Sequence, residues 1–162
     1  KAVFKVRWRR VDLSSNGMDE IEFLISINVG TELKPLTKIA SGGEISRVML
    51  AMKTVLAQTD RIPTLIFDEI DVGIGGHTAN VVGKKLKELS QFRQVICITH
   101  LPQIACLADR HFRVDKQVRN HQTVITAYQL TEEDRVSELA RMQGDKTAQA
   151  AMAYARELLD KR

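Results

Sequence analysis

The sequence has few of the features that mark a secreted or membrane protein. Its 162 residues include two cysteines, Cys97 and Cys106, which are too few for a disulfide framework, so a reducing cytoplasm is the expected compartment. No apolar run approaches the ~20 residues that a membrane-spanning helix needs, and the first residues show no signal-peptide pattern. The sequence therefore predicts a cytoplasmic protein that does not act at a membrane.

The chain also lacks an initiator methionine, since it starts at Lys1, and we expect it to be a fragment of a longer protein. Its length suits one domain with a normal core, because an apolar share of 44% and a charged share of 27% are ordinary for a globular domain. The net charge of +4 permits a polyanionic partner without requiring one.

The pattern around which the chain is organised is a helix start at Ser41. Ser41 is a favourable N-cap, and Glu44 stands at the spacing of a capping box. Gly42 and Gly43 have no side chains, so another molecule can approach free backbone N–H groups there, which favours an anion. Apolar residues then recur at helical spacing up to position 57 and predict a helix: Ile45, Val48, Met49, Met52 and Leu56.

Two short apolar strands carry the polar residues of most interest. The first, over 64–67, ends in the adjacent carboxylates Asp68 and Glu69, and the second, over 94–99, is followed directly by His100. A helix predicted over 78–89 lies between them, so the order indicates a right-handed βαβ unit with parallel strands. Because ligands bind at the carboxyl edge of such a sheet, we expect both acids and the histidine to gather there.

A long antiparallel hairpin is predicted at the N-terminus. Residues 3–13 alternate between apolar and polar, turn residues follow, and 21–29 alternate again. One face of the first strand, called here the basic strand face, carries Lys5, Arg7 and Arg9. This face would suit nucleic acid, but we favour a solvated strand face.

The last part of the chain is predicted to alternate between helices and strands. A short helix is expected over 102–108, followed by two strands over 112–114 and 123–128 that are joined around Asn120. A capped helix is expected from Thr131 to just before Gly144, and Asp145 is expected to cap a final helix.

Together these motifs resemble the C-terminal half of an ABC-type ATPase head. Residues 41–44 resemble the signature motif, 65–69 the Walker B strand and 99–100 the switch-histidine loop, and Asp71 stands in the D-loop. The residues that flank these motifs are similar to those of a bacterial DNA-repair branch of the SMC-like group. The likeness covers nearly the whole chain and is densest between positions 35 and 102.

The resemblance implies an α/β fold, the C-terminal lobe of an ABC- or SMC-type P-loop ATPase head. It would have a mixed sheet with parallel core strands flanked by helices and an N-terminal antiparallel hairpin, with residues 1–162 as a single domain. The Walker A half and the coiled-coil arm are absent from the sequence, since the Gly83-Lys84 pair does not complete G-x-x-x-x-G-K-[ST]. We therefore expect this chain alone to bind ATP weakly and not to hydrolyse it.

The resemblance also implies roles for the residues of the carboxyl edge. Asp68 would hold Mg²⁺ through a bound water, and Glu69 would be the general base. His100 would donate a hydrogen bond to the γ-phosphate or the attacking water. Asp71 would contact the opposing subunit and help to place the water.

The signature residues Ser41, Gly42, Gly43 and Glu44 would act on a second head, closing over the γ-phosphate that it holds. The implied function is ATP binding and hydrolysis between two heads of a homodimer, which drives DNA double-strand-break repair and recombination at the nucleoid. ATP and Mg²⁺ are the implied cofactors. The implied partners are the second head, the missing N-terminal half of the same head, and DNA.

Three alternatives stay open at this point. The chain could be a nucleotide-independent module that binds DNA or a protein through its basic strand face, or the nucleotide-binding fragment of an ABC transporter. The third is a zinc site, because Cys97, His100, Cys106 and His111 follow C-x₂-H-x₅-C-x₄-H. Against zinc stands the position of Cys97 inside an apolar strand.

Overall fold

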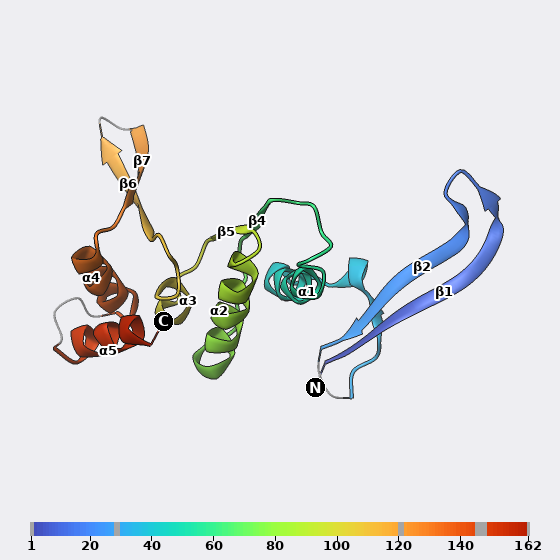
Figure 1. Ribbon diagram of the computed structural model, residues 1–162, viewed down its shortest axis with the longest axis horizontal. Coiled ribbons are helices and arrows are strands. Elements are labelled where there is room, and N and C mark those ends of the chain that lie inside the picture. Colours follow the sequence, from blue (N-terminus) through green and yellow to red (C-terminus); the bar gives the residue numbers. More distant parts are fainter. Residues whose placement is uncertain (1, 28–29, 120–121, 145–148, 162) are drawn as a thin grey trace.

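The computed structural model describes residues 2–27, 30–119, 122–144 and 149–161, and Figure 1 shows them as an elongated arrangement of three parts. The elements follow in the order β1 (Val3–Ser14), β2 (Gly17–Ser26), β3 (Lys34–Pro35), the 3₁₀ helix η1 (Leu36–Lys38), α1 (Gly42–Val55), β4 (Thr64–Phe67), α2 (Gly76–Ser90), β5 (Gln94–Cys97), α3 (Pro102–Ala105), β6 (Phe112–Arg119), β7 (Gln122–Gln129), α4 (Glu132–Met142) and α5 (Gln149–Asp160). The β1–β2 hairpin forms one end, α1, β4, α2 and β5 form the middle, and the elements from α3 onward form the other end.

The middle part contains the expected βαβ unit. Strands β4 and β5 pair in parallel, with Leu65 opposite Val95 and Phe67 opposite Cys97, and α2 connects them. The side chains of these four residues lie in or against one hydrophobic cluster, because alternate residues of a strand point to the same face. The fold class predicted from the sequence is confirmed, and the described strands group into three separate sheets.

Two hydrophobic clusters hold the middle and the C-terminal end. The first joins α1, β4, α2 and α3 through Leu50, Ala57, Phe67, Ile70, Val82, Leu86, Leu89 and Ile104. The second joins α3, α4 and α5 through Ala105, Cys106, Leu139, Ala140 and Ala155. Full burial of a side chain such as Leu89, which is 1% exposed, stabilises the fold by about 1.5–3 kcal/mol.

The buried Arg135 of α4 fixes the end of α3. Its side chain is 2% exposed, and Nη2 donates to the carbonyl oxygens of Cys106 and Ala108 at 3.1 and 2.7 Å. Carbonyls at the end of a helix lack intrahelical partners, so the guanidinium satisfies groups that would otherwise be unpaired in the interior. This links the segment after β5 to α4.

The arginines of the basic strand face lie opposite glutamates of β2 in the N-terminal hairpin. Arg7 lies opposite Glu22 and Arg9 opposite Glu20, with ion pairs of 2.8 and 2.7 Å. The hydrogen bond from Arg9 lowers the pKa of Glu20 below its ordinary value. The two arginines are therefore neutralised across the hairpin, which agrees with a solvated strand face.

Several boundaries differ from those expected. Helix α1 begins at Gly42, directly after the predicted cap Ser41, but it ends at Val55 instead of position 57. Strand β2 covers Gly17–Ser26 instead of 21–29, since it pairs with β1 from the turn onward, with a shift of register between Arg10 and Ser14. The segment 30–38, expected as a loop, contains β3 and η1. The predictions that involve Asn120 and Asp145 lie outside the described residues.

In the described parts of the chain, no helix combines the length and the apolar character that crossing a membrane requires.

Candidate functional site at the carboxyl edge

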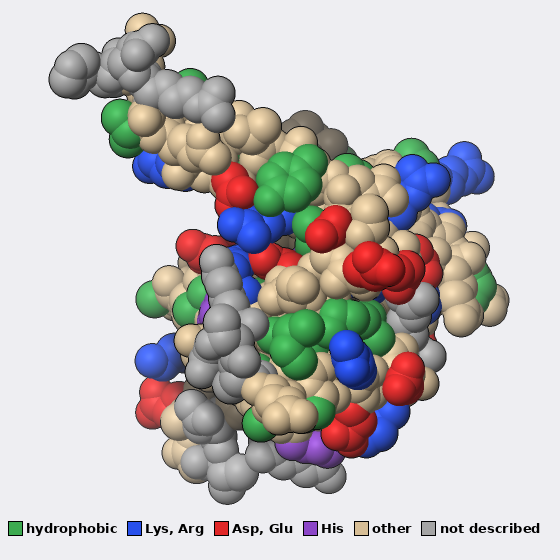
Figure 2. Space-filling model, turned by 90° about the vertical axis from the view of Figure 1, so that its left-hand side faces the viewer, with side chains coloured by type: hydrophobic (Ala, Val, Ile, Leu, Met, Phe, Trp, Pro, Cys, Tyr) green, Lys and Arg blue, Asp and Glu red, His purple; other side chains and the backbone are tan. Residues whose placement is uncertain are grey.

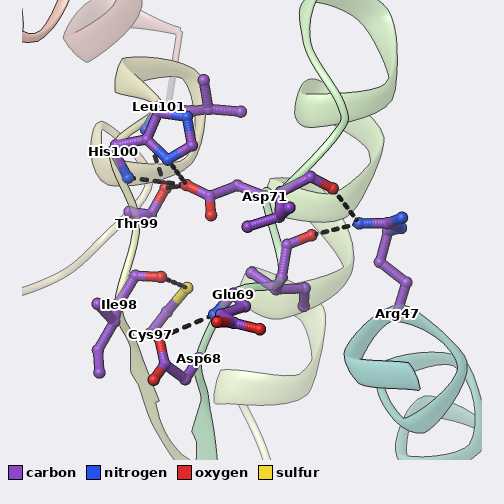
Figure 3. A network of polar contacts seen from close by, with 11 residues as sticks. Arg47, Asp68, Glu69, Asp71, Cys97, Ile98, Thr99, His100 and Leu101 are labelled. Atoms are coloured by element: carbon purple, nitrogen blue, oxygen red, sulfur yellow. Dashed lines mark hydrogen bonds and ion pairs between the residues drawn. The ribbon is translucent and has the colours of Figure 1, made fainter. Parts of the chain in front are cut away.

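The structure brings the predicted acids and histidine to the same edge of the β4–β5 sheet. Asp68 and Glu69 follow β4, and His100 follows β5 after Ile98 and Thr99. The strands stay paired to their ends, because the N–H of Ile98 donates to the carbonyl oxygen of Phe67 at 2.9 Å. Figure 3 shows these residues around the carboxyl edge, with Arg47 of α1 beside them. The side chains of Asp68, Glu69 and His100 are exposed there.

Glu69 has an unusual backbone at this edge. Its φ is 57°, a left-handed conformation that costs a non-glycine residue of order 1–3 kcal/mol. The turn is held by the carboxylate of Asp68, whose Oδ1 accepts from the Glu69 N–H at 2.8 Å. The Glu69 carboxylate lies against Gly42, so closely that a Cβ added to Gly42 would overlap Oε2. The proposed base therefore sits beside the N-terminus of α1, where the helix dipole favours a negative charge.

The start of α1 has the predicted cap. Ser41 has an extended backbone, and its Oγ accepts from the Glu44 N–H at 3.4 Å. This is the N-cap half of the capping box expected from the sequence.

The two glycines after the cap differ in their surroundings. Gly42 is exposed, as expected for a site that meets another molecule. Gly43 is buried, and a Cβ there would lie 2.8 Å from the Glu69 carbonyl oxygen, 3.0 Å from Arg47 Nη1 and 3.1 Å from the Val72 carbonyl oxygen. The expectation that both glycines are open to a second molecule is therefore wrong for Gly43, whose small size lets α1 approach the backbone of its own chain.

Two residues of α1 that the sequence motifs did not single out tie the helix to loop 68–72. Arg47 Nη1 donates to the carbonyl oxygens of Ile70 and Val72 at 3.0 and 2.9 Å, and Ser46 Oγ donates to that of Asp68 at 2.9 Å. Both lie one helical turn after the buried glycine, on the same side of α1. That spacing is the signal that could have identified them.

Asp71 is turned into the chain. Its side chain is 3% exposed, and Oδ2 accepts from Thr99 Oγ1 at 2.6 Å and from the His100 N–H at 2.7 Å. The same oxygen lies 3.0 Å from His100 Nδ1, and Thr99 Oγ1 in turn accepts from the Leu101 N–H at 3.0 Å. The expected contact of Asp71 with an opposing subunit does not fit this burial. The exposed Val72 is the neighbouring residue that faces outward.

Asp68 fits the part expected of it towards a magnesium ion. Mg²⁺ is usually held by one or two carboxylates together with phosphate oxygens and waters. The Asp68 carboxylate is exposed at the carboxyl edge, and its Oδ1 is fixed by the Glu69 N–H. An oriented, accessible carboxylate of this kind suits a site that is completed by a nucleotide.

The zinc alternative does not fit the two sulfur atoms. Cys97 packs against the first hydrophobic cluster and Cys106 belongs to the second. Burial, with smaller contributions from the charges of Asp71 and Asp68, raises the pKa of Cys97 to about 12. Since zinc binds the thiolate, this environment opposes it.

Comparison with known sequences shows that the chain is similar to part of several DNA repair proteins. It is 54% identical to DNA repair protein RecN of Treponema pallidum over 144 residues, which cover 88% of this chain and 25% of that protein. It is 46% identical to RecN of Haemophilus influenzae, covering 91% and 27%, and 44% identical to RecN of Vibrio cholerae, covering 98% and 29%. The chain thus spans about a quarter of the length of these relatives. No family model matches the sequence.

Solved structures share the fold. The SMC head domain of Pyrococcus yayanosii with its coiled coil and joint has a TM-score of 0.59 at 20% identity, covering 99% of this chain and 26% of that one. An SMC ATPase structure from a study of ATP-driven dimerization and DNA-stimulated activation has a TM-score of 0.52 at 22% identity, covering 88% and 83%. At these identities the likeness shows the fold alone. Over most of its length the chain therefore matches a segment of the RecN proteins, and it has the fold of an SMC head domain.

Proposed function

We propose that this chain is the C-terminal part of an ATPase head that, with its N-terminal half, binds and hydrolyses ATP between two heads during DNA double-strand-break repair and recombination. The observation that carries the proposal is the carboxyl edge. Two adjacent carboxylates and an imidazole from neighbouring parallel strands lie there beside the capped N-terminus of a helix. Phosphoryl transfer to water needs a metal, a group that positions the water, and donors to the phosphate, and this edge offers candidates for each.

Each residue has a task in the proposal. Asp68 holds Mg²⁺ through a bound water, Glu69 acts as the general base and His100 contacts the γ-phosphate or the attacking water. The tip of α1, with the half-buried Ser41 and the exposed Gly42, faces the triphosphate of a second head, where its N–H groups meet the negative charge. Bound Mg²⁺ would supply charge neutralisation of the phosphates.

Two exposed apolar faces support a missing N-terminal half as a partner. The face of the β4–β5 sheet opposite α2 presents Ile66, Ile96 and Ile98, with Ile66 67% exposed. The hairpin presents a second such face, made by Phe4, Val6, Trp8, Ile21 and Phe23. Contiguous exposed apolar residues mark surfaces that are covered by another part of a protein. The relatives are about four times as long as this chain, so they contain the residues to cover both faces.

The charge pattern favours the ATPase over a DNA-binding module without nucleotide. The arginines of the basic strand face are paired with glutamates. Figure 2 looks onto the C-terminal end of the molecule, where acidic and basic side chains are interspersed. DNA association in this proposal belongs to the assembled full-length protein, in the cytoplasm at the nucleoid.

The test uses the full-length protein that contains this chain. Glu69→Gln should lower the rate of Mg²⁺-dependent ATP hydrolysis by about 10²-fold or more and leave ATP binding intact. Ser41→Arg should block ATP-driven dimerisation and hydrolysis while a single head still binds ATP. Asp109→Asn, which removes an exposed partner of Lys87, is the matched control and should hydrolyse ATP like the wild type. The proposal fails if Glu69→Gln hydrolyses ATP normally, or if residues 1–162 alone do so.

A further inference from the structure

We infer that Asp71 is a positioning residue for His100, fixing which nitrogen of the imidazole faces the nucleotide. The inference rests on the proposed function, because it concerns the same site. It gives Asp71 a task inside its own head, distinct from the contact with a second subunit expected from the sequence.

Three atoms of Thr99 and His100 converge on one carboxylate oxygen of Asp71. Asp71 Oδ2 lies 2.6 Å from Thr99 Oγ1, 2.7 Å from the His100 backbone nitrogen and 3.0 Å from His100 Nδ1. The backbone and the ring of one residue are therefore held by the same atom. Two of the three contacts fix the loop, and the third fixes the ring.

The contact with Asp71 determines which nitrogen of the His100 imidazole carries the proton. An ionised carboxylate only accepts hydrogen bonds, so Nδ1 must carry the proton in this pair. The neutral imidazole then presents a lone pair at Nε2 and accepts from a water there, and it donates from Nε2 to a phosphate oxygen only as the imidazolium. Asp71 thereby decides what His100 can do at the carboxyl edge.

The side chains of His100 and Asp71 differ strongly in their exposure to solvent. The His100 side chain is 70% exposed, while that of Asp71 is 3% exposed. An exposed imidazole would otherwise sample several rotamers and both tautomers, and ordering it on binding costs conformational entropy. The buried carboxylate orders the ring before the nucleotide arrives.

A purely structural role for Asp71 predicts a different result from a positioning role. If Asp71 only holds the loop through Thr99 and the backbone, its loss harms the site whether or not an imidazole is present. If it acts through the ring, its loss has no further effect once the ring is gone. A double-mutant cycle separates the two.

The experiment measures kcat and KM for ATP in the full-length protein with Asp71→Ala, His100→Ala and the double variant. We expect His100→Ala to lower kcat about 10²-fold, Asp71→Ala to lower it about 10-fold or more, and the double variant to match His100→Ala within about twofold. KM should change less than about threefold. Asp115→Asn removes a partly buried acid paired with Arg113 and Tyr128 in the β6–β7 hairpin, and should leave kcat unchanged.

A second readout does not depend on turnover. In protein labelled with ¹⁵N-histidine, the His100 ring, identified by its loss in His100→Ala, should be protonated at Nδ1 in the wild type. It should shift to a mixture of tautomers in Asp71→Ala. If Asp71→Ala does not fold, Asp71→Asn, which keeps one oxygen but loses the charge, takes its place in both measurements, with a smaller loss of kcat.

The outcomes distinguish the inference from the function on which it rests. The positioning role is overturned if the fold-losses of kcat in the two single variants multiply in the double variant, or if the His100 tautomer is unchanged in the Asp71 variant. The proposed ATP hydrolysis is not affected by either result. A wild type that does not hydrolyse ATP, or a His100→Ala protein with full kcat, overturns the proposed function and the inference with it.

Discussion

The two glycines at the start of α1 should respond very differently to the same substitution. Gly43→Ala places a Cβ 2.8 Å from the carbonyl oxygen of Glu69 and 3.1 Å from that of Val72. Both obstacles are backbone atoms, so α1 must move away from loop 68–72. Overpacking of this kind costs about 1–3 kcal/mol. Gly42→Ala meets only the end of the Glu69 side chain, which can rotate aside, and alanine is the better helix former by about 1 kcal/mol.

Hydrogen exchange measured by mass spectrometry in the full-length protein resolves the difference locally. Each 1.4 kcal/mol is a factor of ten, so Gly43→Ala should speed exchange in peptides covering α1 and loop 68–72 by about 5- to 150-fold. Gly42→Ala should leave this exchange within about fivefold of the wild type. Peptides of the β6–β7 hairpin serve as an internal control in both proteins. Equal effects of the two substitutions, or no effect of Gly43→Ala, would refute the packing argument.

Three further substitutions or conditions test other parts of the structure. Arg47→Met removes two charge-assisted hydrogen bonds to the backbone, so loop 68–72 should lose about 2–4 kcal/mol of protection in the same exchange experiment, and Arg47→Lys should lose less. Leu89→Ala, at a side chain 1% exposed in the first cluster, should cost about 2–5 kcal/mol, measured as a lower temperature of thermal unfolding. Burial, and then the charge of Arg135, lowers the pKa of His111 below its ordinary value of 6.5. As the pH falls, His111 therefore takes up a proton in the unfolded chain before it does so in the folded protein, and the stability of the fold should decline below about pH 6.5. Burial opposes ionisation of Glu138, but the hydrogen bond and charge of Arg141 outweigh it and lower its pKa below 4.5, so a further loss should follow as the pH falls below about 4.5. In thermal unfolding against pH, His111→Gln should remove the first decline and keep the second; an unchanged profile would contradict this assignment.

Local patterns predicted the parts of the fold that depend on few residues. Alternation in β1, helical spacing in α1 and the order of β4, α2 and β5 each follow from short stretches of sequence, because side chains that share one face of a strand or helix recur with a fixed period. The meeting of Glu69 and His100 at one edge was predictable for the same reason, since parallel strands end at the same side of a sheet. The ends of elements were less predictable, as β2 shows, because the alternation of apolar residues does not mark where a strand begins or ends.

The surroundings of single residues could not be predicted, because they depend on contacts distant in sequence. Asp71 is 28 and 29 residues from the two donors that hold it, and nothing in the sequence near it distinguishes a buried carboxylate from one that faces a second subunit. The burial of Gly43 likewise depends on carbonyl groups of loop 68–72. The pairing of Arg9 with Glu20 also escapes prediction from the turn, because the register shifts between Arg10 and Ser14 and moves Arg9 to a different partner.

Loop 68–72 is the point where these distant contacts meet. From one side, Ser46 and Arg47 of α1 hold the carbonyl oxygens of Asp68, Ile70 and Val72. From the other side, the segment after β5 donates two hydrogen bonds to the carboxylate of Asp71. Since the loop is fixed by partners on both sides, Glu69 can be held in a left-handed conformation that it would not keep in isolation. The position of the proposed catalytic base is therefore a property of the packing between α1 and the β4–β5 sheet, and it cannot be assigned to β4 alone.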